Sequence, residues 1–271
     1  MKGVKHFVEN LDLLLLAYQR KDDADLSARA KTLALEALRV IDLDVYHGLG
    51  SVDPKRFRED SMSYLRASWL AIQFGRDVTR YRNEIEKVLP AIVQHLPTRG
   101  VDQRMGFSLL FSQLGYPPAE TLEKIYPETL IARHPPLSYF LASPDRPYDI
   151  THEIFALTAR GARQFQFPGE TDKVYTTEMV RRLLEHSMRQ ANLDLAGELL
   201  VNLAELGEGS TALAKDAREW IFKGQNADGS FGVYDPEHAK KLKGNPMYDS
   251  RIGGNLHTTM VCLWALSETE P

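Results

Sequence analysis

The sequence predicts an all-α fold that is built from repeated pairs of helices, and three observations support this prediction. Nearly every segment of the 271-residue chain has the apolar spacing of an amphipathic helix, and no segment shows convincing strand alternation. Five apolar segments begin with aspartate or asparagine, and their starts lie 42, 47, 45 and 61 residues apart. More charged helical segments lie between them, as in helix-pair repeats.

The five apolar segments define the expected repeat. They begin at Asp60, Asp102, Asp149, Asp194 and Asn255, with a weaker sixth copy at Asp25. Aspartate and asparagine accept hydrogen bonds from free helical N–H groups, so each is expected to be an N-cap, and glycines close several of the segments. The charged partners are expected at residues 78–95, 118–125, 172–190 and 209–223. We expect the apolar helices inside, the charged helices outside, and a single domain over residues 1–271.

Composition excludes several classes of partner. Hydrophobic residues make up 43% of the chain and charged residues 26%, which is typical of a globular protein. The net charge of −4 gives no general attraction to nucleic acid or to anionic membranes. A single cysteine, Cys262, excludes an internal disulfide and favours the cytoplasm. No apolar run is long enough to span a bilayer, and Glu9 and Asp12 interrupt the N-terminal apolar run, so we expect a first helix there and no signal peptide.

Two segments depart from the repeat. Residues 131–147 are rich in proline, and residues 234–254 lengthen the last repeat and carry a local cluster of basic side chains. Both are expected to be solvated loops or, alternatively, the rim or lid of a binding site, since long loops often carry binding groups.

Polar residues cluster in the first turns of the inner helices. Because these helices are covered on their outer side, such residues can only cap a helix, pair with one another or face a central cavity. In a closed barrel they would surround one mouth, near the positive ends of several helix dipoles, where an anionic or metal-bound ligand is favoured. The residues of this kind are Tyr64, Arg104, His152, Glu153, Glu198 and His257.

A turn near the C-terminus resembles a known repeat. Residues 217–232, AREWIFKGQNADGSFG, have the form A-x-x-W-[IL]-x-x-x-Q-x-x-D-G-[ST]-[FW]-G. This form is similar to the glutamine–tryptophan repeat of the terpenoid-cyclase and prenyltransferase superfamily. The resemblance implies an α/α toroid of five to six helical hairpins, in which the glutamine closes an outer helix and Phe231 packs beneath the next pair.

The last inner helix extends this resemblance. Residues 256–266, LHTTMVCLWAL, are similar to the last inner helix of protein prenyltransferase β subunits, whose histidine binds zinc. The resemblance implies that His257 and Asp194 are metal ligands, whereas Ala196 stands where that family has its cysteine ligand. The acidic motifs of squalene-type cyclases and of diphosphate–magnesium sites are absent, and we interpret residues 22–25, DDAD, as a helix cap with exposed charges.

These patterns assign roles to individual residues. The expected catalytic residues are His152, Glu153, Glu198 and His257. The expected substrate-binding residues are Tyr64, Arg104, Asp149 and Thr258. The expected metal ligands are Asp194 and His257, and with Glu198 and His152 they would form a nitrogen–oxygen site for zinc, iron or manganese.

Alternatives remain for each role. His257 is a zinc ligand, an acid–base group or a satisfied histidine of an inner helix. His152 could instead be packed between helices, with Glu153 as a cap, and Arg104 could be paired with Asp102 or Glu153. The aromatic side chains of the inner helices are expected to pack the core, and Cys262 is expected to be a small buried hydrophobic residue.

Two functions agree with this sequence. The first is a soluble enzyme of a biosynthetic pathway that acts on a small amphiphilic or peptide-like substrate in the central cavity, with a divalent metal such as zinc as an optional cofactor. The second is a non-catalytic helical-repeat module that binds a peptide or a partner helix. The sequence contains no complete catalytic motif that would decide between them.

Overall fold

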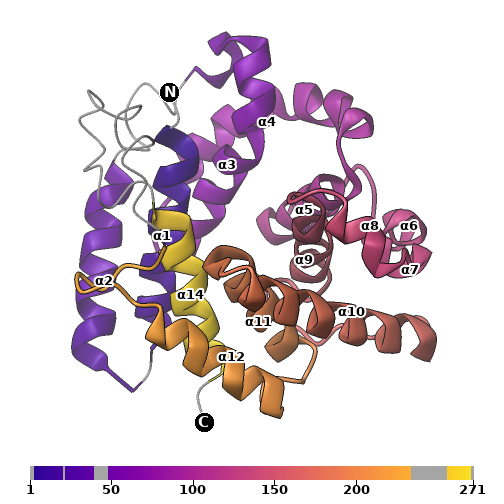
Figure 1. Ribbon diagram of the computed structural model, residues 1–271. Helices are drawn as coiled ribbons and strands as arrows, with labels where there is room; N and C mark the ends of the chain where they lie inside the picture. Colours follow the sequence, from indigo (N-terminus) through magenta and orange to yellow (C-terminus); the bar gives the residue numbers. More distant parts are fainter. Residues whose placement is uncertain (1–2, 21, 40–47, 233–254, 270–271) are drawn as a thin grey trace. The chain divides into compact units, whose positions relative to one another are not determined.

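The fold is all-α over the part of the chain that the structure describes. This computed structural model describes residues 3–20, 22–39, 48–232 and 255–269, and helices form the regular structure throughout these ranges (Figure 1). Within the same ranges the backbone forms no strand, only an isolated bridge between Gln225 and Phe231. None of the described helices is long and apolar enough to cross a membrane.

The chain divides into two compact units. The first comprises residues 1–100 and 107–120, and the second comprises residues 101–106 and 121–271. A single toroid over residues 1–271 stays a prediction, and each unit is described by itself.

The described part of the first unit is formed by helices from α1 to α5. Its elements are α1 (Gly3–Gln19), α2 (Ala24–Ala37), η3 (Leu49–Ser51), α3 (Pro54–Gln73), α4 (Thr79–His95), η4 (Leu96–Thr98) and most of α5 (Val101–Leu114). Helix α1 packs against α2 and α3, which confirms the expected first helix. A buried ion pair joins α1 to α3, with Arg66 Nη2 at 2.6 Å from Asp12 Oδ1. Asp23 caps α2 by accepting from Leu26 N, as expected for the acidic segment at residues 22–25.

The second unit contains the remaining helices. They are α6 (Leu122–Ile125), η5 (Tyr126–Glu128), α7 (Leu130–Arg133), α8 (Leu137–Leu141), α9 (Arg146–Leu157), α10 (Glu170–Arg189), α11 (Leu193–Glu205), α12 (Ala212–Lys223) and α14 (Leu256–Glu268). Helix α11 packs against α9, α10, α12 and α14 (Figure 1). Its residues from Leu195 to Leu203 are all buried, so α11 is the central helix of this unit.

Helices α9, α11 and α14 run parallel to one another. Between α9 and α11, Thr151 Oγ1 donates to Glu198 Oε2 at 2.5 Å, and Thr158 Oγ1 donates to Glu205 Oε2 at 2.8 Å. These contacts are seven residues apart on both helices, which is two helical turns in the same direction. Between α11 and α14, Asp194 binds His257, and three residues later Gly197 lets the backbones approach closely, because a Cβ atom there would lie 3.2 Å from the carbonyl carbon of Val261. These two contacts advance in the same direction along both helices. The three N-termini therefore lie at the same end of this parallel group.

The predicted N-caps were wrong for four of the five inner helices. The caps are Asp53, Gly100, Asp145 and Asn192 in place of Asp60, Asp102, Asp149 and Asp194. Only Asn255 stands at an N-cap position as expected. The helices start earlier because proline residues follow Asp53 and Asp145, and proline at the first turn favours a helix start. The predicted C-terminal glycines are confirmed for α3, α5 and α11, where Gly75, Gly115 and Gly207 have positive φ.

The turn at residues 224–232 attaches to the last helix. Gln225 Nε2 donates to the carbonyl oxygen of Gly229 at 3.0 Å. Phe231 is fully buried, and its backbone N–H donates to Thr259 Oγ1 on α14 at 3.0 Å. The turn is therefore attached to α14 through Phe231, in agreement with the expected packing of this ring against the next helix, whereas the side chain of Gln225 binds within the turn and does not close α12.

The two departures from the repeat have different outcomes. Residues 131–147 do not form one open loop, because α7, α8 and the start of α9 lie there. Thr129 stabilises the start of α7 by accepting from Ala132 N. Residues 234–254 lie outside the described residues, and their expected role as a rim or lid stays a prediction.

Candidate functional site

Three predicted residues meet where α11 and α14 begin. Asp194 and Glu198 lie one turn apart on α11, and His257 lies in the first turn of α14. Each offers one donor atom, and these atoms all lie within 4.8 Å of one another. Such a group could hold a metal ion, and it contains both expected metal ligands.

Hydrogen bonds fix the histidine in one orientation. His257 Nδ1 lies 2.8 Å from Asp194 Oδ1, and Nε2 lies 3.7 Å from Glu198 Oε1. A hydrogen on Nδ1 that is donated to Asp194 leaves Nε2 with its lone pair toward Glu198. Proteins usually orient a metal-binding imidazole in this way, with a hydrogen bond from its other ring nitrogen to a carboxylate.

The carboxylates of this group are well supported by neutral donors. Tyr148 Oη donates to Asp194 Oδ2 at 3.0 Å, and Thr258 Oγ1 donates to Asp194 Oδ1 at 2.8 Å. Burial raises the pKa of Asp194, but the hydrogen bond and the charge of His257, followed by the hydrogen bonds from Thr258 and Tyr148, outweigh it, so the pKa lies below its ordinary value. Burial and the nearby Asp194 raise the pKa of Tyr148, so this hydroxyl keeps its proton and remains a donor.

His152 lies beside the group from α9. Its Nε2 atom is 3.9 Å from Glu198 Oε2, and its Nδ1 atom is 3.7 Å from Asp102 Oδ2 on α5. The side chain of Glu198 is only 2% exposed, whereas that of His152 is 47% exposed. The structure thus brings His152 to the edge of the group, where its side chain has room to move.

Glu153 points elsewhere. It is buried, and its two oxygens accept from the backbone N–H groups of Leu130 and Ile131 at 2.9 and 3.2 Å. Burial raises the pKa of Glu153 to about 8, against the opposing effect of these two hydrogen bonds. Neighbouring residues of a helix point about 100° apart, so the side chains of His152 and Glu153 lie on different faces of α9. The geometry gives Glu153 a role in holding α7 against α9.

The expected substrate-binding residues have different partners. Arg104 forms a two-pronged pair with Glu128, at 2.8 and 3.0 Å, instead of pairing with Asp102 or Glu153. Asp149 is half-buried, and burial followed by the charge of Asp102 raises its pKa. Thr258 binds Asp194, as described above. Tyr64 belongs to the first unit, where its fully buried ring stacks on Phe57 at 6.1 Å.

The chain carries no thiol ligand at this group. Ala196, at the position of the cysteine ligand in the prenyltransferase resemblance, is fully buried. Cys262 is also buried, as expected, and its Sγ atom lies 3.6 Å from the carbonyl oxygen of Leu193. Burial and then the charge of Asp194 raise the pKa of Cys262 to about 12, so the thiol stays protonated.

Comparison with known proteins places the chain in a family. A family model described as a domain of unknown function, DUF6895, matches residues 1–267. The chain belongs to the DUF6895 family. No curated protein and no solved structure matches it.

Three residues at the site of this DUF6895 chain were not predicted. They are Asp102, Tyr148 and Thr151, which contact His152, Asp194 and Glu198. The spacing of the repeat could have indicated two of these residues, Tyr148 and Thr151. Tyr148 and Thr151 lie 46 and 47 residues before their acidic partners, which is one repeat length.

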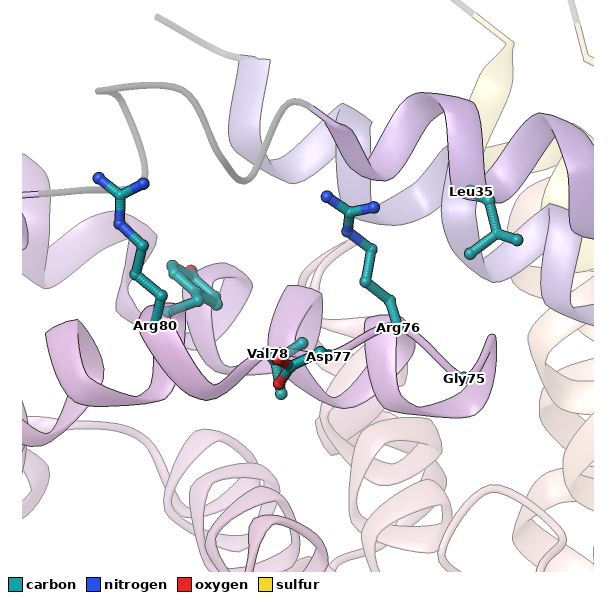
Figure 2. Close-up of a pocket in the computed structure, with 7 residues that line it drawn as sticks. Leu35, Gly75, Arg76, Asp77, Val78 and Arg80 are labelled. Atoms are coloured by element: carbon teal, nitrogen blue, oxygen red, sulfur yellow. The ribbon is translucent and has the colours of Figure 1, made fainter.

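A separate cavity of about 480 Å³ lies in the first unit. It is lined by Leu35, Gly75, Arg76, Asp77, Val78, Arg80 and Tyr81, from α2, the connection between α3 and α4, and the start of α4. Figure 2 shows that the side chains of Arg76 and Arg80 extend toward the same side. None of the residues that the sequence singled out for chemistry lines this cavity.

Proposed function

We propose that this protein is a metal-assisted enzyme that acts on a small amphiphilic or peptide-like substrate. The observation that carries the proposal is the convergence of Asp194, Glu198 and His257, whose donor atoms lie within 4.8 Å of one another. Two carboxylates and one imidazole suit zinc, iron or manganese.

The surroundings of the three residues fit a bound ion. Glu198 Oε1 and His257 Nε2 are 3.7 Å apart, which is too far for a hydrogen bond. Two atoms that bind the same ion at about 2.1 Å lie about 3–4 Å apart for ordinary coordination angles. The buried Glu198 also accepts a hydrogen bond from the neutral Thr151, which holds its carboxylate in place without neutralising it.

The residues of this chain then have distinct chemical roles. A bound ion would supply Lewis acidity toward an oxygen atom of the substrate or of water. Asp194 orients His257, and Thr258 and Tyr148 orient Asp194. When only the ion at Asp194, Glu198 and His257 is bound, His152 lies next to Glu198 with nearly half of its side chain exposed, so it is placed to accept or donate a proton at the edge of the site. Chemistry that depends on a zinc-bound cysteine is not supported by this residue set, since Ala196 replaces that cysteine.

The toroid remains part of the proposal. Three parallel inner helices, with α10 and α12 packed against α11, are the arrangement that three consecutive hairpins of an α/α toroid would have. The turn that ties Phe231 to α14 agrees with the same fold. We assign the enzyme to the cytoplasm, where the one cysteine of the chain would stay reduced.

Metal analysis of the purified protein tests the proposal. After dialysis against Zn²⁺, Mn²⁺ or Fe²⁺, we expect at least one tightly bound ion per chain, and we expect His257→Ala to lose it. His95→Ala, on α4 of the first unit, is the matched control and should leave the metal content unchanged. Far-UV circular dichroism of each variant reports whether the helices are intact.

A different result would favour the second function. If the wild-type protein retains none of these ions, the metal-assisted enzyme is ruled out. A metal-free protein that binds peptides equally well after His152→Ala and His257→Ala would be a non-catalytic helical-repeat module.

A further inference from the structure

The buried carboxylate of Glu198 has the same kind of neighbour on both sides, a histidine that is followed by an aspartate. On one side, His257 faces Glu198 Oε1 with Nε2 at 3.7 Å and faces Asp194 with Nδ1. On the other side, His152 faces Glu198 Oε2 with Nε2 at 3.9 Å and faces Asp102 with Nδ1 at 3.7 Å. One buried carboxylate therefore lies between two imidazoles, and each imidazole has an aspartate behind it.

From this arrangement we propose that Glu198 bridges two divalent cations, the second of which is bound by His152 and balanced by Asp102 and Asp149. This inference rests on the proposed function, since the first cation is the one held by Asp194, Glu198 and His257. It adds a second position, to which the α9 and α5 residues contribute.

The distances support a second ion on the His152 side. The gaps of His152 to Glu198 and to Asp102 are too long for hydrogen bonds. The distance from His152 Nε2 to Glu198 Oε2 is close to the distance from His257 Nε2 to Glu198 Oε1. An ion bound at about 2.1 Å from both atoms of either pair would fit between them. In sites with two metal ions, the ions lie about 3.5–4 Å apart, a separation that a bridging carboxylate spans. His152 is not in the group whose donor atoms all lie within 4.8 Å, so its exposed side chain has to turn toward Glu198 on binding.

The net charge of this group also favours a second cation. Four carboxylates gather here, from Asp102, Asp149, Asp194 and Glu198. Within the described residues, no lysine or arginine lies within ion-pair distance of any of them. His152 and His257 pair with Asp102, Asp194 and Glu198, and Asp149 lies near enough for the charges of Asp102 and His152 to act on it. With both histidines neutral, one divalent ion leaves two negative charges without compensation, and a second ion neutralises them. Uncompensated charges in a partly buried site are costly, so a second cation stabilises this arrangement.

The number of bound ions tests this inference, with Mn²⁺ as the probe. We expect two Mn²⁺ ions per wild-type chain by isothermal titration and elemental analysis, and an electron paramagnetic resonance spectrum with the splitting of a spin-coupled pair. We expect Asp102→Asn and His152→Ala to bind one ion each and to show the spectrum of an isolated Mn²⁺ ion. Arg104→Gln is the control on α5, because its side chain pairs with Glu128, and it should still bind two ions.

The outcomes separate the two proposals. One ion per wild-type chain, unchanged in Asp102→Asn, would overturn the second position and leave the proposed function standing. No bound ion at all would overturn both. Two ions in the wild type that both persist in His152→Ala, with the helical circular dichroism intact, would show that the second ion binds elsewhere and would also overturn the inference.

Discussion

Replacing Glu205 by glutamine should make the stability of the protein less dependent on pH. Glu205 lies in the last turn of α11, where Thr158 Oγ1 donates to its Oε2 atom at 2.8 Å. Burial raises the pKa of Glu205 to about 7, although the hydrogen bond from Thr158 and the charge of Arg160 lower it. The folded protein therefore holds a proton here that the unfolded chain releases.

The size and sign of the effect follow from this difference. The ordinary pKa is 4.5, and one pKa unit corresponds to about 1.4 kcal/mol, so the rise to about 7 is equivalent to about 3 kcal/mol. Because the pKa is raised in the folded state, the full stability is present below pH 4.5 and is lost as the pH rises toward 7. Glutamine cannot ionise, so the variant does not lose this stability as the pH rises. The free energy of unfolding of the variant relative to that of the wild type should therefore increase by about 2–3 kcal/mol between pH 5 and pH 8.

Urea unfolding at pH 5 and pH 8 measures the difference. The quantity to compare is the free energy of unfolding of Glu205→Gln minus that of the wild type at each pH. Glu185→Gln, on the exposed face of α10, is the control, because its side chain is 53% exposed and pairs with the exposed Arg189 at 3.7 Å. If Glu205→Gln changes the stability by the same amount at both pH values, Glu205 is ionised in the folded protein and the reasoning is refuted.

Three further substitutions test the packing. Gly197→Ala should destabilise the protein by about 1–3 kcal/mol in urea unfolding, because the new Cβ atom would lie 3.2 Å from the backbone of α14. Gly169→Ala, where the Cβ atom meets nothing within 4 Å, should stay near the wild type, and equal losses for both glycines would contradict the close approach. Asp12→Asn should cost about 1–3 kcal/mol, since it removes the largely buried carboxylate that accepts a hydrogen bond from Arg66, and a loss below about 1 kcal/mol would show that this pair is solvated. Phe231→Ala should lower the free energy of unfolding by about 3–5 kcal/mol through loss of a fully buried ring, and an unchanged urea midpoint would show that the turn is not anchored to α14.

The sequence predicted the helical class because periodicity is a local property. The alternation of apolar and charged helices follows from the side chains along each segment, and α1, α11 and α14 lie where this pattern indicated. The helix starts were harder to predict, because an aspartate stabilises a helix to a similar degree at the N-cap and in the first turn. Asp149 shows the ambiguity, since the helix begins three residues earlier, after Asp145.

The candidate site was predictable only where the repeat register determines a contact. Asp194 and His257 lie on adjacent parallel helices, so aligning the helix starts brought them together. Glu153 was misassigned because its direction depends on α7, a four-residue helix in a proline-rich segment that has too little periodicity to be recognised. Asp102 was considered only as a cap or as a partner of Arg104, and its approach to His152, 50 residues later in the chain, is a tertiary contact that no local pattern encodes.

The same register also explains why chemistry collects at this end of the second unit. A tyrosine donates to an aspartate 46 residues later in two consecutive places, from Tyr126 to Asp172 and from Tyr148 to Asp194. Each of these aspartates also binds one histidine, Asp172 with His134 and Asp194 with His257. Among the described residues, no third metal-binding side chain joins Asp172 and His134. At Asp194 the same helix, α11, adds Glu198 one turn later, and this buried second carboxylate turns a repeated structural contact into a group that can hold a metal ion.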